Sequence, residues 1–508
     1  MRRIVFVFAC ILLSCGELFS QHKPLSPVVN IPGVFKEEYE GVEKGTPFVL
    51  QKVVKLKKDP GPGVSRNQAV LVMDGVQFGL PMNMLGVLAF RPDDKNAFWQ
   101  IEQLSNDLIA YYEKKGYQES MRKEQAQEAD DYLRELEQSN LFYEDAAVED
   151  YLQCMLLSIV PDRMVVNLMG GVPHVRILKS PSPDMLMLAN HCLLVSTGML
   201  TTLDTEEELF AMLSREVAHY VLDHAMITVN KAITRAKRAE FWGTVMEGAA
   251  LVSEAYLSER YDYYEPGAVF ATAELVGALV NYNVLNRMGL DYSEAQEKEA
   301  DEVAKRFLQL TGKNCGALVS ALTKVKAYYT RLGDFKPLTG NGAYATLPAR
   351  LEKLGKAPEG TTEDRIYLKK TSGVVSYEAT LQDYNKNYKE SRRLATKNVA
   401  NGMACPDDYL MVARSIMKQS NTPEANRECL SYLDQADALS KGANLNSCKM
   451  RILLLLRANK QMDAVDLLHR YQDLLNAVYQ QPHTEEDARW IAAEHTWAEK
   501  LLERTYIM

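Results

Sequence analysis

A glutamate and a histidine three residues apart are the first side chains of this sequence whose types and spacing suggest chemistry. Glu216 and His219 lie in the segment Arg215-Glu216-Val217-Ala218-His219. In the pattern H-E-x-x-H, helical periodicity places two histidines on one face, where they share a zinc ion, and the glutamate polarises a water molecule. Arg215 stands at the position of the first histidine, so the motif is one ligand short. Taken alone, the broken motif favours a His219 that packs against a helix or lies on the surface.

A second acidic segment supplies the carboxylates that such a site needs. Glu297 and Asp301 are one helical turn apart in a periodic segment that runs from 294 to about 310, so they share a face. In a glutamate-liganded zinc site the third ligand comes from such a helix, and a carboxylate one turn later orients a ligating imidazole. The alternative is an acidic first turn that complements the helix dipole.

Several elements must position these side chains. Thr205 and Glu208 form a capping box, which predicts a helix that begins there and runs beyond Met226. Short β-branched runs at 164–168, 172–178 and 192–196 predict a small sheet beside it. Residues 227–290 predict further helices that pack against the helix of Glu216 and His219. Polar residues interrupt these helices too often for a membrane span. Their tyrosine cluster (Tyr261, Tyr263 and Tyr264) suits either a packed core or a substrate groove.

Residues 150 to 354 resemble the HtpX- and BepA-like gluzincins of metallopeptidase family forty-eight. The resemblance rests on ordered segments: the strand and turn at 188–200 with the acidic helix start at 206–209, then Glu216 to His219 with the downstream His224, then 297–301, and finally 346–351. The last segment is similar to the family's Thr-His-Pro sequence with its following arginine, here Arg350. The resemblance implies a gluzincin-type peptidase domain in which helices surround a small sheet.

The resemblance also implies a zinc endopeptidase. Glu216 would be the general base, His219 and Glu297 would be metal ligands, and Asp301 would orient a ligand. The sequence departs from the family at Arg215 and at Leu347, which replaces a histidine near the site. An arginine stays protonated and offers no lone pair to a metal. Rescue by His224 is disfavoured, because it lies about 140° further round the helix from His219, and His191 is the other conceivable substitute.

These departures lead to two functional hypotheses. In the first, the protein is an exported pseudoprotease that binds unfolded or envelope proteins, or peptides, with zinc absent or weakly bound and with the Arg215 guanidinium in place of the metal. In the second, it is an active zinc metalloendopeptidase of protein quality control with an unusual ligand set. Whether the chain is an enzyme stays open at this stage.

Composition limits the alternatives. The chain has 508 residues, enough for roughly three domains. Its 58 basic and 67 acidic residues give a formal charge of -9, which disfavours nucleic acid as a partner. Beyond the first twenty residues the six cysteines form no CxxC pair, so disulfides cannot be assigned from the sequence.

The first twenty residues predict a signal peptide, because Arg2 and Arg3 precede an apolar run from 4 to 13. Cleavage after Ser20 would release a periplasmic protein. Cleavage before Cys15 would instead leave a lipid-anchored protein of the bacterial envelope. The sequence favours neither form.

The predicted fold class is α+β, mostly α. We expect a signal peptide at 1–20, a small β-rich module at 25–97, a metallopeptidase-like domain with its leading helices at 98–354, a connector at 355–407 and a helical domain at 408–508. The charged stretch at 119–138 reads as a solvated helix face. The amphipathic segments at 410–417, 425–439, 445–456 and 464–475 resemble tetratricopeptide-type pairs that present a peptide-binding surface, with a plain helical bundle as the alternative. The histidines of this region, His469, His483 and His495, read as surface or packing residues.

Overall fold

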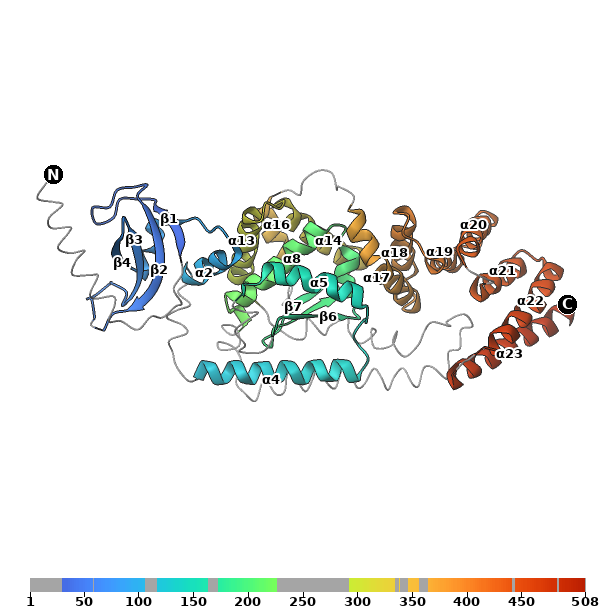
Figure 1. Ribbon diagram of the computed structural model, residues 1–508. Helices are drawn as coiled ribbons and strands as arrows, with labels where there is room; N and C mark the ends of the chain where they lie inside the picture. Colours follow the sequence, from blue (N-terminus) through green and yellow to red (C-terminus); the bar gives the residue numbers. More distant parts are fainter. Residues whose placement is uncertain are drawn as a thin grey trace, which may run out of the picture.

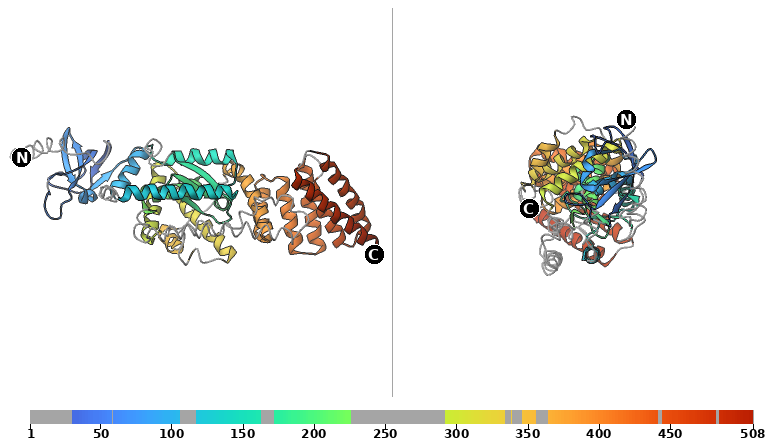
Figure 2. Two further views of the ribbon diagram at one scale, coloured as in Figure 1. Left: turned by 90° about the horizontal axis from the view of Figure 1, so that it is seen from below. Right: turned by 90° about the vertical axis from the view of Figure 1, so that its left-hand side faces the viewer.

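The computed structural model describes residues 30–57, 59–105, 117–162, 172–225, 292–333, 338, 346–355, 364–440, 444–481 and 484–507. In these residues the protein is mostly helical α+β, and its parts follow one another along an elongated molecule (Figures 1 and 2). The predicted signal peptide, the run at 164–168 and the segment 227–290 with its tyrosine cluster lie outside the described residues.

The N-terminal part is a five-stranded antiparallel sheet, as the valine-rich sequence predicted. Its strands are β1 (Ile31–Phe35), β2 (Pro47–Lys55), β3 (Asn67–Met73), β4 (Val76–Pro81) and β5 (Leu88–Phe90), in the order β4-β3-β2-β1-β5. Asp74 and Gly75 both have positive φ and form the tight β3–β4 turn. A short 3-10 helix, η1 (Met82–Val87), leads into β5.

Helix α2 (Lys95–Ser105) connects this sheet to the central part. Phe98 and Trp99 of α2 pack against Phe307, with ring centroids 5.2 and 5.1 Å away respectively. The Trp99 Nε1–H donates to the Ile159 carbonyl at 2.7 Å, which satisfies the one polar group of this fully buried indole. The leading segment is therefore anchored in the core of the central part.

The central part contains a three-stranded sheet with helices on both faces. Its order is β6-β8-β7, with β6 (His174–Leu178) parallel to β8 (Cys192–Ser196) and β7 (Met185–Met187) antiparallel to it. Side chains of β8 alternate: Leu193 and Val195 join the core beneath α5 (Ala146–Ile159) and α8 (Glu206–Val221). Cys192 and Leu194 instead face α4 (Tyr117–Gln138), which covers the other side of the sheet (Figure 1).

Helix α8 begins as predicted but ends earlier. Thr205 caps it by accepting from the Glu208 amide, whereas its last helical residue is Val221 rather than one beyond Met226. The chain leaves the helix because Asp223 adopts a positive φ of 63°, a conformation that a helix cannot continue, and Arg122 of α4 holds the Asp223 carboxylate. This turn fixes the position of the following His224.

The element before α8 depends on a close backbone approach. A short helix, α7 (Thr197–Thr202), follows β8, and a Cβ atom added at Gly198 would lie 2.1 Å from the Pro181 carbonyl oxygen. Only glycine fits there. Behind α8 lie α13 (Glu294–Leu310), α14 (Gly316–Leu332) and α16 (Leu347–Leu354), all of which contribute to the same core.

The C-terminal part is a series of helices in which each packs against the next. They are α17 (Arg365–Tyr384), α18 (Tyr388–Ala400), α19 (Pro406–Gln419), α20 (Pro423–Leu439), α21 (Leu445–Arg457), α22 (Gln461–Tyr479) and α23 (Glu485–Ile507). Two of them, α17 and α18, lie in the stretch expected to be a connector. Glu378 of α17 accepts from the Thr197 hydroxyl at 2.8 Å, and the Tyr367 hydroxyl donates to the Leu200 carbonyl, so α17 is fixed to α7.

Two further observations concern the described residues only. Each of the six cysteines found there has a free thiol: Cys154, Cys192, Cys315, Cys405, Cys429 and Cys448. No helix in the same part of the chain combines the length and the apolar composition needed to cross a bilayer.

Candidate functional site

Helices α8, α13 and α16 bring six predicted side chains together in the core. Glu216, Arg215 and His219 lie on the face of α8 that packs against α13, which carries Glu297 and Asp301. Arg350 reaches the same place from α16. None of the six is more than 4 % exposed, so their charges interact in a medium that screens them weakly. We call Arg215, Glu216, Glu297, Asp301 and Arg350 the charged cluster.

Arg215 contacts every carboxylate of the charged cluster. Its Nη1 donates to Glu216 Oε1 at 2.6 Å, and its Nη2 donates to Glu297 Oε2. Its Nε lies 3.4 Å from Asp301 Oδ1. The planar guanidinium has the donors to engage several carboxylates at once, which an ammonium group would do with less directional control.

Arg350 is the second cation. Its Nε and Nη2 donate to the two oxygens of Asp301 at 2.8 and 2.7 Å, and its Nη1 forms an ion pair with Glu297. Such a two-point contact fixes the orientation of Asp301. Leu347, at the start of the same helix, is fully buried in the apolar core, so the position of the family's histidine contributes no donor here.

The charges of the cluster balance only when one carboxyl is protonated, because two guanidinium groups face three carboxylates. Burial raises the pKa of Glu216 to about 7, Glu297 adds to that rise, and Arg215 and Arg350 oppose it. Burial also holds the pKa of His219 well below its usual value, with Arg215, His224 and Arg350 acting in the same direction. His219 is therefore neutral at pH 7.

His219 is held by His224, which the sequence suggested only as a disfavoured substitute ligand, and by Tyr292, which the sequence did not single out. Its Nδ1 lies 3.0 Å from His224 Nδ1, and His224 Nε2 lies 3.2 Å from a carboxylate oxygen of Glu299. The Tyr292 ring stacks on the His219 ring at 3.9 Å. We assign the tautomers from these contacts: Glu299 only accepts, so His224 carries its proton on Nε2, and its Nδ1 accepts from His219.

This assignment leaves His219 Nε2 with a free lone pair. That atom is buried, has no hydrogen-bond partner among the described residues, and lies 3.9 Å from Glu297 Oε1. A zinc-binding histidine uses such a nitrogen while its other nitrogen donates a hydrogen bond. His219 therefore keeps the tautomer of a ligand, although the position beside it is filled by Arg215.

The side chains present do not fit a catalytic zinc ion. Such an ion needs three protein ligands at about 2.0 to 2.2 Å. His219 Nε2 and Glu297 are the candidate donors, but Glu297 Oε2 accepts from both Arg215 and Arg350. Throughout the described residues, no three His, Cys, Asp or Glu side chains are grouped as they would be around a metal. His191, the other conceivable substitute, lies in the turn before β8 with its ring 5.3 Å from the Tyr220 ring, outside the cluster.

Comparison with known families identifies the central part. Residues 148–359 match the sequence model of Peptidase family M48, from the start of α5 to just past α16. We call this matched range the M48 domain; the family uses zinc, and all six site residues lie in the range. No curated protein shows significant similarity to the chain. The finer resemblance to HtpX and BepA stays a prediction.

Sequence reasoning found which residues meet at the site but missed how they bind one another. Arg350 was noted only for its place in a segment, whereas it is the two-point partner of Asp301. A signal was present: a lone arginine at a position that helical packing buries needs a carboxylate partner. For Tyr292 and Glu299 the sequence offered no comparable signal.

Proposed function

We propose that this chain is an exported pseudoprotease, whose M48 domain binds unfolded or envelope proteins, or peptides, without hydrolysing them. The observation that supports this proposal is the placement of the Arg215 guanidinium between Glu216 and Glu297. It occupies the position where the family's first ligand would stand, and it donates hydrogen bonds to the residues that would act as base and ligand.

This arrangement leaves the site without the parts of a hydrolase. A general base needs an accessible lone pair within hydrogen-bond reach of a water molecule. Glu216 is 3 % exposed, and its carboxylate accepts from Arg215. Because the guanidinium keeps its proton at any ordinary pH, a change of pH does not release Glu216 from it.

One observation favours the second candidate, an active zinc metalloendopeptidase of protein quality control. The lone pair of His219 Nε2 is unused and lies beside Glu297. Zinc binding there would require the Arg215 side chain to leave two carboxylates, which makes this the weaker candidate. It predicts one tightly bound zinc ion for each chain, coordinated by His219 and Glu297.

Two measurements separate the candidates. Zinc is quantified in the purified full chain after incubation with zinc and desalting, and the same chain is assayed for cleavage of casein. We expect less than stoichiometric zinc and no cleavage, with binding of unfolded casein retained. Stoichiometric zinc together with cleavage that Glu216→Gln abolishes would overturn the pseudoprotease.

A second variant tests whether the rest of the site remains intact. Arg215→His restores the missing imidazole while His224 and Glu299 keep His219 in the ligand tautomer. We expect this variant to bind zinc and the unaltered chain not to. Arg427→His, at an exposed position of α20, is the matched control for an added histidine. If Arg215→His binds no more zinc than this control, the site has lost more than one ligand.

Export is a proposal as well. It rests on Arg2, Arg3 and the apolar run that follows them, and it places the protein in the bacterial envelope, either periplasmic or anchored through a lipid on Cys15. The intact mass of the mature protein distinguishes a chain that begins at Gln21 from one that begins at lipidated Cys15. A chain that retains Met1 would contradict export.

A further inference from the structure

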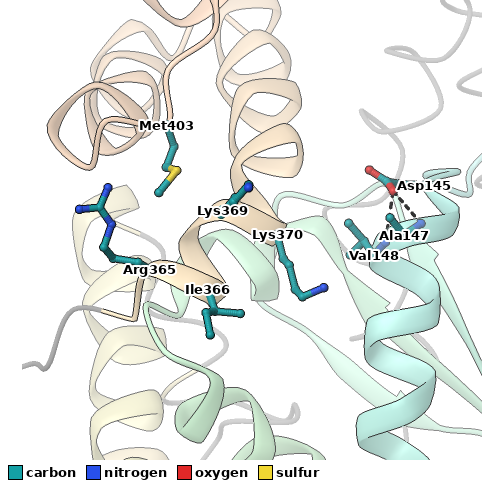
Figure 3. Close-up of a pocket in the computed structure, with 8 residues that line it drawn as sticks. All are labelled: Asp145, Ala147, Val148, Arg365, Ile366, Lys369, Lys370 and Met403. Atoms are coloured by element: carbon teal, nitrogen blue, oxygen red, sulfur yellow. Dashed lines mark hydrogen bonds between the residues drawn. The ribbon is translucent and has the colours of Figure 1, made fainter.

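A groove lies where the M48 domain meets the C-terminal helices. It has a volume of about 630 Å³, within the usual size range of ligand sites. Figure 3 shows Arg365 and Met403 on one side, the start of α5 with Asp145 on the other, and Ile366 and Lys369 between them. The groove shares no residue with the charged cluster.

The groove is rich in cationic groups. Arg365, Lys369 and Lys370 line it, and within the described part of the chain neither Arg365 nor Lys369 has an ion-pair partner. The Lys370 ammonium lies 4.9 Å from the centre of the Tyr151 ring. Asp145 is the one acidic residue of the lining, and its Oδ1 already accepts from the amides of Ala147 and Val148 at 3.0 and 3.2 Å.

The position of these cations on α17 is itself informative. Arg365 is the first residue of α17, and the first turn of this helix contains no acidic residue. A helix N-terminus carries partial positive charge, so a basic residue there is unfavourable for the helix. The cap, Asp364, carries a negative charge at this end of the helix, and its carboxylate accepts from the Tyr367 and Glu206 amides. The three cations of the lining, Arg365, Lys369 and Lys370, are the groups that an anionic partner would meet.

The groove also exposes apolar surface. Ile366, between the cations in sequence, is 66 % exposed. Met403 and Val148 contribute further apolar atoms to the lining. Methionine adapts its shape readily to different apolar partners. A purely ionic ligand would leave this surface in water.

We propose that the groove binds an acidic peptide segment of another protein, with carboxylates on Arg365, Lys369 and Lys370 and an apolar side chain over Ile366 and Met403. Charge complementarity selects this occupant: the groove is cationic although the chain as a whole carries a formal charge of -9. The same net charge disfavours a nucleic acid, which needs an extended basic surface. The site is separate from the charged cluster, so the proposal stands whether or not the M48 domain hydrolyses peptides.

The test uses the full chain and a fluorescein-labelled hexapeptide of alternating glutamate and leucine, followed by fluorescence anisotropy. We expect saturable binding that weakens as salt rises, with a lysine–leucine peptide and a glutamate–serine peptide binding far less. Arg365→Glu with Lys369→Glu should weaken binding by at least about tenfold, and Ile366→Ser by several-fold.

Matched controls separate the groove from general electrostatics. Lys389→Glu with Lys500→Glu makes the same change of net charge at exposed positions outside the groove, and it should leave the affinity unchanged. Equal weakening by the two double variants would overturn the proposal. So would tighter binding of a single-stranded oligonucleotide than of the acidic peptide, or absence of peptide binding by the folded chain.

Discussion

Replacing Arg215 by methionine tests whether its guanidinium neutralises the charged cluster. The change keeps most of the side-chain volume but removes the donors that reach Glu216, Glu297 and Asp301. Glu297 and Asp301 retain Arg350, whereas Glu216 loses its hydrogen-bonded cation. Leaving one buried member of an ion pair unpaired costs about 3 to 5 kcal/mol.

The cost should depend on pH. At pH 8 the Glu216 carboxyl of the variant is either charged without a partner or must take up a proton, so the full cost applies. At pH 5 this carboxyl is already protonated, because burial raises its pKa to about 7 even when Arg215 is present. What remains there is the loss of the hydrogen bonds that Arg215 donates, about 1 to 3 kcal/mol.

Thermal unfolding of the full chain at both pH values measures these costs. For a domain of the size of the M48 domain, each kcal/mol shifts Tm by about 2 to 4 °C, so about 3 to 5 kcal/mol corresponds to roughly 6 to 20 °C at pH 8. Arg427→Met is the control, since its ion pair with Glu424 is solvent-exposed and should contribute less than about 1 kcal/mol. An Arg215→Met variant that melts with the unaltered protein at pH 8 would refute the neutralising role of Arg215.

Three further outcomes follow from the same structure. The pKa of Glu216 is about 7 in the folded chain, above its ordinary value of 4.5. Between these two pH values the folded state therefore binds more protons than the unfolded state. The protein loses up to about 3 kcal/mol of stability as pH rises from the lower value to the higher one. Glu216→Gln should flatten this fall, measured by urea unfolding at pH 5 and pH 8, and an unchanged pH dependence would contradict it. Gly198→Ala should destabilise the protein by about 1 to 3 kcal/mol, because the added Cβ would collide with the Pro181 carbonyl. The control is Gly86→Ala, whose added Cβ has no atom within 4 Å. Equal unfolding midpoints for the two variants would argue against the collision. Removal of metal with EDTA should leave Tm of the unaltered chain unchanged but lower that of zinc-loaded Arg215→His, and a fall in the unaltered chain would show that it depends on a bound metal.

Local rules predicted those parts of the fold that depend on neighbouring residues. The start of α8 at Thr205 follows from a capping interaction within one turn, and the β-rich module follows from alternating valines. The end of α8 could not be predicted in this way. It depends on Asp223, whose carboxylate binds Arg122 about a hundred residues earlier in the chain. Helices α17 and α18 lie in the polar stretch expected to be a connector with some helix in it, and their burial comes from contacts with α7 and with each other.

Helical periodicity places Glu216 with His219, and Glu297 with Asp301, on one face of each helix. The resemblance to the metallopeptidase family is what implied that the two pairs form one site. The partners of these residues depend on how three helices cross. Arg350 meets Asp301 across 49 positions of sequence, and His219 meets His224 through a turn that breaks the helix. Neither contact is encoded in a local pattern.

The charged cluster connects three helices of the M48 domain through charges that belong to the chain itself. Arg215 joins α8 to α13, and Arg350 joins α16 to α13, so two side chains connect the three helices at their buried crossing. In a zinc peptidase the dication would neutralise the carboxylates at this point, and its loss would leave them repelling one another. Here the neutralising charges are covalently part of the chain and cannot dissociate. The variant Arg215→His would therefore exchange a permanent charge for a zinc ion that can dissociate. We expect the stability of the domain in this variant to depend on zinc concentration.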